Sequence, residues 1–323
     1  MKAPRFWWQS APTFLSRALS PVAWTYQKLS ILDRSSQKTI DPGVPVICIG
    51  NLVLGGAGKT PVTAFLASHL KKSHILSRGY GRKSTQTKRV DSRHHVSQDV
   101  GDEPLLLSQF APVWVGKNRP ELAKLACKAE ARILLLDDGF QNKTLKKTLN
   151  LLVVDGIRGF GNQKTFPAGP LREPLLPGLK RADALILMGE DHHALQEKFK
   201  NKVPFFRAHF EPVKKDLEQL KEKPTFAFAG IAAPEKFFSM LKNLGIDLIE
   251  TASFGDHHPY STQELQELHR QAHSKNAVLI TTEKDWWRLS PEWRTKVRPI
   301  RGQAVFQEPE KFIDFVKQKC CIK

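Results

Sequence analysis

The residues best suited to chemistry lie within residues 46–60, whose sequence is VICIGNLVLGGAGKT. The β-branched start predicts a buried strand, the glycines predict a loop, and the apolar spacing after Lys59 predicts a helix. This order is typical of a phosphate-binding loop, in which backbone N–H groups face an anion, Lys59 reaches the outer phosphates and the Thr60 hydroxyl ligates Mg²⁺. We therefore predict a nucleoside triphosphate site with these binding residues: Val53, Leu54, Gly55, Gly56, Ala57, Gly58, Lys59 and Thr60.

The loop departs from the strict pattern G-x-x-x-x-G-K-[ST], because Val53 stands where that pattern has glycine. Gly55 and Gly56 lie inside the loop instead and supply its conformational freedom. The alternative is a glycine-rich turn that only joins a strand to a helix. Gly-Lys-Thr with both flanking elements in place favours the phosphate-binding loop.

Two later stretches add charged groups to the same predicted edge. Residues 132–138, RILLLDD, predict a buried strand that ends in carboxylates. Because parallel strands bring their C-terminal ends to one edge of a sheet, we predict that Asp138 is the Mg²⁺ partner of Thr60. The prolines of PAGPLREP predict an irregular loop that presents Arg172 and Glu173, either for binding or only as a rigid surface loop.

Two other motifs contain candidate acid–base groups. Asp102 and Glu103, in the sequence GDEP, precede an apolar helical segment, and carboxylates at such a position commonly act only as helix caps. FGDHHPY at residues 254–260 places Asp256, His257 and His258 on a loop, where they are candidates for a base or an orienting group. From the residues alone we interpret Asp102 and Glu103 as caps and do not choose between the two histidines.

The composition favours an anionic partner. The 323 residues include 50 Lys and Arg against 32 Asp and Glu, a formal net charge of +18. This excess favours nucleic acid, an acidic membrane surface or a phosphorylated substrate, although solvated basic faces would give the same count. Four cysteines without metal-ligand spacing indicate reduced thiols in the cytosol. Because the apolar runs are short and interrupted, we expect a protein that neither spans a membrane nor is exported.

The pattern of elements predicts an α/β protein with a P-loop NTPase-type, mostly parallel sheet and a second, smaller α/β domain. We place an N-terminal helical segment at residues 1–40, the P-loop domain at residues 41–212 and the smaller domain, which would close the cleft, at residues 213–323. In the smaller domain we predict strands at residues 225–229, 247–251 and 277–281, and helices at residues 234–244 and 262–273.

Residues 1–40 combine aromatic and basic side chains with an apolar stripe at helical spacing. This combination predicts an amphipathic helix that lies in a bilayer surface. A helix packed on its own domain is the alternative. The aromatic residues are Phe6, Trp7, Trp8, Phe14, Trp24 and Tyr26, and the stripe consists of Val22, Tyr26, Leu29 and Leu32.

A second basic stretch, residues 71–95, surrounds the sequence RGYGRK. Gly79 and Gly81 predict a loop, which either presents Arg78 and its neighbours to a partner or is merely solvated.

The chain closely resembles one family, the tetraacyldisaccharide 4'-kinases of bacterial lipid A biosynthesis, from about residue 44 to residue 285. A single glycine-rich loop would be weak evidence, but eight motifs in the family's order are specific, and valine in the loop is typical of that family. These motifs are GNLVLGGAGKTP, SRGYGRK, GDEP, DDGFQ, PAGPLREP, KRAD, FGDHH and TTEKD.

The resemblance implies transfer of the γ-phosphoryl group of ATP to the 4'-hydroxyl of the disaccharide 1-phosphate precursor of lipid A, forming lipid IVA. It implies that Asp102 is the catalytic carboxylate, in place of our cap interpretation, and that His257 is its partner across the domain cleft. It also implies that Lys59, Thr60 and Asp138 serve ATP and Mg²⁺.

The resemblance further implies a protein on the cytoplasmic side of the bacterial inner membrane, held there by its N-terminal segment. Arg78, Arg172 and Glu173 are candidate substrate residues, with the loop around Arg78 placed to hold the substrate's 1-phosphate. The sequence departs from the family at Asn142, where histidine is usual, and asparagine can form hydrogen bonds but cannot carry the charge of an imidazolium.

Two other functions compete with the lipid kinase. A phosphate-loop ATPase that recruits a partner at the membrane would need neither Asp102 nor the Asp256–His257 pair. A nucleic-acid-dependent ATPase would fit the net charge, but we find no nucleic-acid-binding module in the sequence. We expect no nucleic-acid partner and find no sign of an obligate protein partner.

Overall fold

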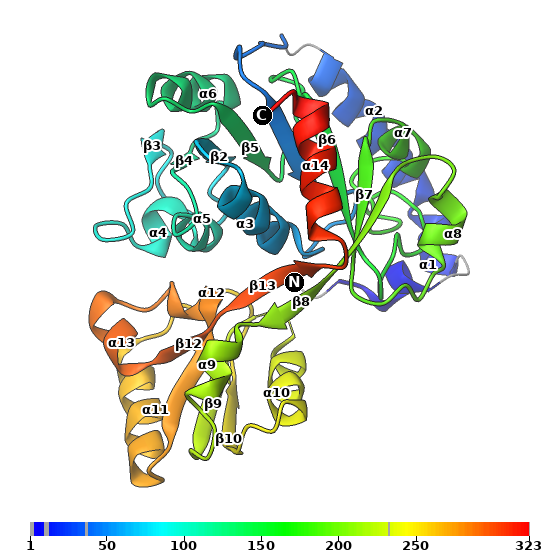
Figure 1. Ribbon diagram of the computed structural model, residues 1–323. Coiled ribbons are helices and arrows are strands. Elements are labelled where there is room, and N and C mark those ends of the chain that lie inside the picture. Colours follow the sequence, from blue (N-terminus) through cyan, green and yellow to red (C-terminus); the bar gives the residue numbers. More distant parts are fainter. Residues whose placement is uncertain (1–2, 10–12, 36–37, 232, 323) are drawn as a thin grey trace.

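The computed structural model describes residues 3–9, 13–35, 38–231 and 233–322, which form two bodies, each built on its own sheet (Figure 1). The large sheet has nine strands in the order β13-β8-β7-β6-β1-β5-β2-β4-β3, and the small sheet has four in the order β10-β9-β11-β12. In chain order the strands of the large sheet are β1 (Val46–Gly50), β2 (Ser73–Ser77), β3 (Lys88–Arg89), β4 (Val113–Val115), β5 (Ile133–Asp137), β6 (Leu149–Asp155), β7 (Ala184–Met188), β8 (Phe205–Pro212) and β13 (Gly302–Phe306). Those of the small sheet are β9 (Thr225–Ala229), β10 (Leu248–Ser253), β11 (Val278–Thr282) and β12 (Arg298–Ile300).

Strand β1 lies in the middle of the large sheet, in parallel pairing with β5 on one side and β6 on the other. The register pairs Ile49 with Asp137, so the loop after β1 and the carboxylates after β5 leave the sheet at the same edge. The apolar runs of both strands are fully buried, as a parallel sheet with two covered faces requires. The predicted fold class is confirmed.

Helices cover both faces of the large sheet (Figure 1). One core joins α3, α5 and α14 to the sheet, and the other joins α6 and α8. The helices of this body are α3 (Lys59–His69), α4 (Ser97–Val100), α5 (Asp102–Leu107), α6 (Arg119–Lys128), α7 (Leu175–Lys180), α8 (Leu195–Phe199) and α14 (Pro309–Cys320).

The smaller body also has a sheet between two helical layers. On one face α10 packs through Phe237, Phe238 and Leu241, and on the other α11 packs through Leu265 and Leu268. The predicted strands and helices of this region occur, with ends that differ by a few residues. Its helices are α9 (Lys214–Glu218), α10 (Pro234–Asn243), α11 (Thr262–Ser274), α12 (Glu283–Trp286) and α13 (Pro291–Lys296).

The end of the chain differs from the predicted boundary, because residues 302–320 return to the large body instead of completing the small one. Strand β13 pairs antiparallel with β8, and α14 buries Phe312 in the core that also contains α3. The sequence analysis did not predict this return, since the sheet on which β13 and α14 pack depends on a partner strand far away in sequence. The two bodies are therefore joined by two crossings, after β8 and after β12.

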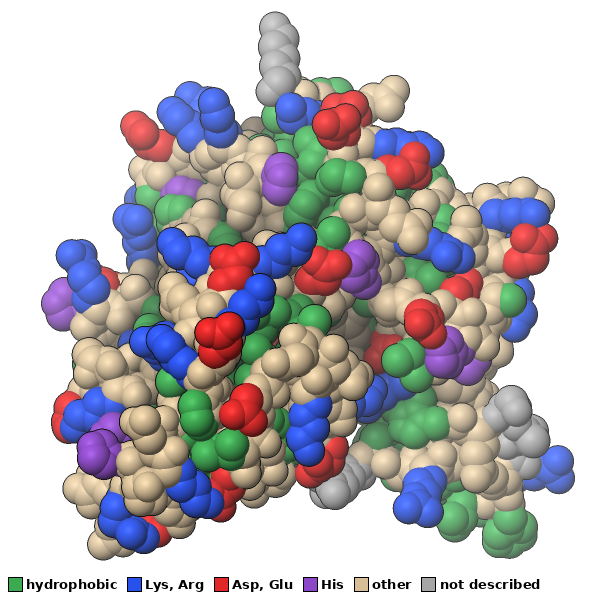
Figure 2. All heavy atoms as spheres, turned by 60° about the horizontal axis from the view of Figure 1, so that its bottom comes forward, with side chains coloured by type: hydrophobic (Ala, Val, Ile, Leu, Met, Phe, Trp, Pro, Cys, Tyr) green, Lys and Arg blue, Asp and Glu red, His purple; other side chains and the backbone are tan. Residues whose placement is uncertain are grey.

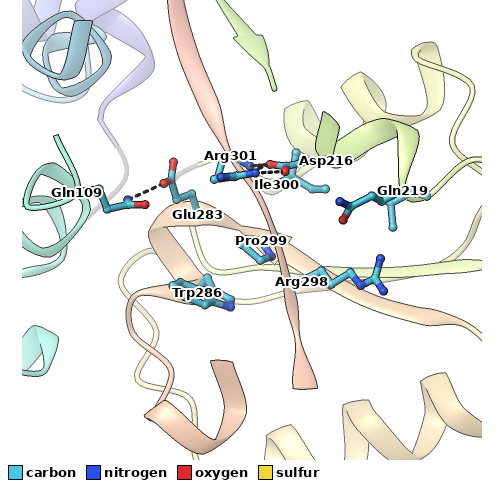
Figure 3. Close-up of a pocket in the computed structure, with 10 residues that line it drawn as sticks. Gln109, Asp216, Gln219, Glu283, Trp286, Arg298, Pro299, Ile300 and Arg301 are labelled. Carbon is cyan, nitrogen blue, oxygen red and sulfur yellow. Dashed lines mark hydrogen bonds and ion pairs between the residues drawn. The ribbon is translucent and has the colours of Figure 1, made fainter. Parts of the chain in front are cut away.

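The two crossings are held by polar contacts between elements that are distant in sequence. Arg301 donates from its backbone nitrogen and from Nε to Asp216 Oδ2, at 3.0 and 2.9 Å. Gln109, just after α5, donates to Glu283 Oε1 at 2.9 Å, and burial raises the pKa of the Glu283 carboxyl. Figure 3 shows both pairs at the rim of a cavity of about 440 Å³, which also contacts Trp286.

The N-terminal segment packs on the loop around residues 160–170. Trp7 is buried and donates from Nε1 to the carbonyl of Pro167 at 3.1 Å, and Ser16 Oγ donates to the carbonyl of Ala168 at 3.0 Å. The other face of the segment leaves Phe14 and Trp24 exposed, at 85% and 60%. One face of the segment therefore fits the packed interpretation, and the opposite face fits the interfacial interpretation. The elements are a 3₁₀ helix, η1 (Arg5–Trp8), and the helices α1 (Phe14–Ala18) and α2 (Ser20–Ser35).

Part of the predicted stripe cannot be compared with the structure, because the side chains of Leu29 and Leu32 lie outside the described residues. Among the residues that are described, no helix combines the length and the apolar character needed to cross a bilayer.

We predict that Phe312→Ala lowers the free energy of unfolding by about 3–5 kcal/mol, because it removes a fully buried ring from the core of the large body. Urea denaturation followed by circular dichroism measures the loss. Phe14→Ala, at a ring that is 85% exposed, is the matched control and should change stability by no more than about 0.5 kcal/mol. Equal effects of the two substitutions would contradict the packing of α14 in this core.

Candidate active site

The predicted phosphate-binding loop connects β1 to α3. Gly58 precedes the first helical residue, Lys59, with φ +85°, and Gly55 has φ +109°. These backbone conformations favour glycine, and a Cβ on Gly58 would lie 2.9 Å from the side chain of Met188. The helix N-terminus and Lys59 therefore stand together at the sheet edge, as an anion site requires.

Two other segments brace this loop. The buried Asn51 donates from Nδ2 to the carbonyls of Val53 and Gly55, at 2.7 and 3.3 Å. The loop at residues 167–174 lies alongside, with the nitrogen of Leu54 donating to Pro170 and the nitrogen of Arg172 donating to Leu52. This pairing explains how PAGPLREP, which follows the loop by more than one hundred residues, brings Arg172 to the site.

Asp138 lies between two cations. Arg172 Nη1 donates to both of its carboxylate oxygens at 3.1 Å, and Lys59 Nζ lies 3.5 Å from Oδ1. Burial by itself raises the pKa of this carboxyl, but Lys59 and Arg172 outweigh burial, so the pKa lies below its ordinary value. Asp138 is therefore ionised at neutral pH. No contact between the Thr60 and Asp138 side chains is among those described, so their role as a Mg²⁺ pair remains a prediction.

Asp137 is a second carboxylate of the site, which the sequence analysis noted but did not assign. Its side chain is 3% exposed, and Thr63 of α3 donates to Oδ1 at 3.3 Å. Burial, with the negative charges of Glu103 and Asp138, raises the pKa of Asp137 to about 7. A buried carboxyl with a raised pKa next to an ionised one is a recurring feature of functional sites. In the sequence, the fully apolar run that precedes Asp137 was the signal that could have indicated its burial.

Asp102 and His257 come from different bodies and meet at the interface. His257 Nδ1 lies 3.0 Å from Asp102 Oδ2, and because a carboxylate only accepts hydrogen bonds, Nδ1 is the donor. Gly101 before Asp102 has φ +95°, and a Cβ there would lie 2.9 Å from the carbonyl of Tyr80, so only glycine allows this approach. Asp102 is the first residue of α5, and the residue before it, Gly101, is the N-cap. The interpretation of Asp102 as the cap is therefore wrong, and its carboxylate accepts from His257 instead.

The electrostatics of Asp102 combine opposing effects. Burial raises its pKa, while the hydrogen bond from His257 and the charges of Arg288 and Lys284 lower it, and the net shift is downward. Its neighbour Glu103 lies 3.8 Å from Lys284 Nζ and is close enough to Asp137 to raise the pKa of that group. Glu103 thus links the carboxylate cluster at the β5 edge to the Asp102–His257 pair.

Two other predicted positions, Arg78 and Glu173, differ in their surroundings. Arg78 is exposed and adds its positive charge near Arg119, a buried arginine whose Nη1 lacks a hydrogen-bond partner among the described residues. Glu173 is not presented to the surface as expected, because it is 6% exposed and accepts from Gln141 and Arg181. It braces the loop behind Arg172 instead.

The side chain of Asn142 stabilises its own turn. Its Oδ1 accepts from the nitrogen and hydroxyl of Thr144 at 3.2 and 3.0 Å. Among the described residues its side chain contacts none of the groups of the predicted site, so the change from the usual histidine leaves the arrangement around Asp138 in place.

Comparison with known proteins shows which family the chain belongs to. The family model LpxK, described as tetraacyldisaccharide-1-P 4'-kinase, matches residues 15–321 of the chain. The chain belongs to this family. The predicted family and the prediction of a kinase are therefore confirmed.

Individual members of the tetraacyldisaccharide 4'-kinase family are similar over nearly their whole length. The enzymes of Rhodospirillum centenum and Phenylobacterium zucineum are 43% and 42% identical to this chain, covering 96% and 95% of it and 94% and 96% of their own lengths. The crystal structure of LpxK from Aquifex aeolicus in complex with ATP is 30% identical, with a TM-score of 0.74, and covers 95% of this chain and 100% of that chain.

We predict that Lys59→Ala lowers ATP-dependent turnover by about two orders of magnitude or more, because the site loses the cation that would face the outer phosphates. Coupled ADP release measures the change. Lys124→Ala, at an exposed position on α6, is the matched control and should leave turnover unchanged. Near-normal turnover of Lys59→Ala would rule out this loop as the phosphate site.

Proposed function

We propose that the protein transfers the γ-phosphoryl group of ATP to the 4'-hydroxyl of the tetraacyldisaccharide 1-phosphate precursor of lipid A, forming lipid IVA. The observation that supports this most directly is the 3.0 Å contact between His257 and Asp102, next to the edge that carries the phosphate-binding loop. A switch ATPase has no need of a base for an acceptor hydroxyl, whereas a sugar kinase does. The ATP complex of LpxK, with the same fold, supports ATP as the donor.

In this proposal the loop from Val53 to Thr60 binds the phosphates and Lys59 neutralises their charge. Asp102, ionised at neutral pH, accepts the proton of the acceptor hydroxyl, and His257 orients that carboxylate and spreads the charge that develops. Arg172 donates a hydrogen bond to Asp138 and so fixes the position of this carboxylate. Its positive charge also lies near the place where the transferred phosphoryl group would accumulate negative charge. Because His257 belongs to the small body, the Asp102–His257 pair exists only while the two bodies are closed on each other, as they are here.

The residues at the edge of the large sheet fit Mg²⁺. Thr60, Asp137 and Asp138 supply a hydroxyl and two carboxylates, the hard oxygen donors that this ion prefers, and the raised pKa of Asp137 marks a place where added positive charge is favourable. Phosphate oxygens and water would complete the coordination. Bound there, Mg²⁺ would neutralise phosphate charge during transfer.

The experiment that tests the proposal uses γ-labelled ATP, Mg²⁺ and the lipid A disaccharide 1-phosphate in mixed micelles. We expect label on the lipid with the wild type, and a rate at least about 10²-fold lower with Asp102→Ala, because proton transfer to a positioned base contributes that much. Asp99→Ala, at a partly buried carboxylate nearby on α4, is the control and should keep the rate. ATP hydrolysis with unlabelled lipid would favour the membrane switch instead.

We also propose that the protein works at the cytoplasmic face of the inner membrane. The exposed aromatic face of α1 and α2 provides apolar area next to basic residues, as interfacial helices do. Lys28 Nζ lies 5.3 Å from the ring centre of Trp24, so a cation and an aromatic ring are paired on this face. Arg78 and its loop are placed to hold the substrate's 1-phosphate.

We predict that Phe14→Glu and Trp24→Glu each weaken binding to vesicles that contain anionic lipid by about tenfold or more, because each removes an apolar contact with the bilayer. Sedimentation with the vesicles measures binding, and activity on micelle-dispersed substrate should remain. Leu244→Glu, at an exposed position after α10, is the control. Unchanged binding by both aromatic variants would remove the interfacial role of this segment.

A nucleic-acid-dependent ATPase is less well supported. Figure 2 shows basic and acidic side chains interspersed over one face of the molecule instead of one continuous basic field. Salt-sensitive binding to DNA or RNA that stimulates turnover would favour this alternative.

A further inference from the structure

We propose that Arg288 is a positioning residue that assembles the Asp102–His257 pair across the two bodies. This inference rests on the proposed function for its catalytic meaning. The geometry that carries it does not depend on that function.

Arg288 makes four contacts with a side chain that is 5% exposed. Its Nε donates to Asp102 Oδ2 at 2.7 Å. Its Nη2 approaches His257 Nδ1 to 3.2 Å, which is a close contact and not a hydrogen bond, because Nδ1 donates its hydrogen to Asp102. Its Nη1 donates to Asp285 Oδ1 at 2.7 Å and to the carbonyl of Gly230 at 2.8 Å. One guanidinium therefore touches both members of the pair and two groups that lie behind them in the small body.

The partners in the small body form a fixed support. Asp285 is fully buried and accepts from Tyr260 OH at 3.0 Å, from Thr282 Oγ1 at 2.6 Å and from the nitrogen of Gly230 at 3.1 Å. Asp285 is thus satisfied largely within its own body. Arg288 Nε, by contrast, bonds a carboxylate of the other body, so its contact with Asp102 serves the interface.

The carbonyl of Gly230 sets the position of His257 as well as that of Arg288. The nitrogen of His257 donates to it at 3.0 Å, in a residue with φ +60°, and Arg288 Nη1 donates to the same oxygen. A Cβ on Gly230 would lie 2.7 Å from Tyr260 OH, so only glycine allows this convergence. The backbone of His257 and the guanidinium of Arg288 are therefore held relative to each other within the small body.

Both groups of the small body bond the same oxygen of the large body, Asp102 Oδ2. The other oxygen, Oδ1, makes no hydrogen bond with a side chain of the described residues and remains for the acceptor hydroxyl. Asp102 is largely buried, and burial raises its pKa. Without Arg288, the remaining favourable contacts are His257 and, at longer range, Lys284, so the carboxyl would be protonated at a higher pH.

The tests use three variants of the full-length protein. Arg288→Gln removes the charge, Arg288→Lys keeps a charge but loses the planar set of donors, and Arg288→Ala leaves space that guanidinium ion can fill. Arg294→Gln is the matched control. It is a partly buried arginine of the same body, whose guanidinium stacks on Trp287 at 4.7 Å and touches neither Asp102 nor His257.

The first measurement is the pH dependence of phosphoryl transfer in micelles, as the ratio of each variant's rate to the wild-type rate, because ionisations shared by the proteins cancel in this ratio. A base is active only when ionised, so a raised pKa moves the acid limb to higher pH. For Arg288→Gln we expect a kcat about tenfold lower at neutral pH, an unchanged KM for ATP, and an acid limb about one pH unit higher. Arg288→Lys should recover most of the pH shift but only part of kcat, and guanidinium should restore Arg288→Ala.

A structural role alone would give a different result. Arg288→Gln would then lower the rate by the same factor at all pH values, and guanidinium would not restore the activity of Arg288→Ala. Arg294→Gln, if it lost as much thermal stability as Arg288→Gln, would then lose as much activity. Any of these three outcomes overturns the proposal.

The second measurement does not depend on the reaction. In ¹⁵N spectra of histidine-labelled protein, the signal of His257, assigned with His257→Asn, should shift in Arg288→Gln and stay in place in Arg294→Gln. An unchanged signal overturns the proposed positioning. If the wild type transfers no phosphoryl group, the proposed function fails, and this spectrum still decides whether Arg288 positions His257.

Discussion

The parallel pairing of β1 with β5 is the constraint on which the site depends. It pairs Ile49 with Asp137 and so brings the phosphate-binding loop and two carboxylates to one edge of the sheet. Because both strands are buried on both faces, a shift in register would place charged groups in the apolar core. The separation of roles at this edge follows from local charge, since Asp138 between two cations stays ionised while Asp137, buried beside other carboxylates, has a pKa near 7.

The second half of the site belongs to the other body, and the way the chain crosses between the bodies explains how it is held. Two crossings, after β8 and after β12, restrict relative motion more than one linker would. The contacts of Asp216 with Arg301 and of Gln109 with Glu283 lie at the crossings, and Asp102 meets His257 and Arg288 at the other end of α5. Helices α5 and α12 thus carry the interface at both ends.

The N-terminal segment packs on the large body with one face and exposes apolar side chains on the other. Trp7 and Ser16 bind it to the loop at residues 160–170, which continues into the segment that braces the phosphate-binding loop. Its opposite face remains apolar and exposed at Phe14 and Trp24. The physical arrangement therefore connects a proposed membrane contact to the nucleotide edge through a single continuous loop.

The sequence by itself determined the elements and supplied most of the groups to which we assign a chemical role, because strand and helix periodicity and glycine-rich loops are local properties. Lys59, Thr60 and Asp138 follow from that local pattern, and the family resemblance added Asp102 and His257. Only the tertiary structure decided that residues 302–320 return to the large sheet, that Glu173 is buried, that Asp137 lies buried beside Asp138, and that Arg288 contacts Asp102. These depend on burial and on contacts between distant segments, which a local pattern does not encode.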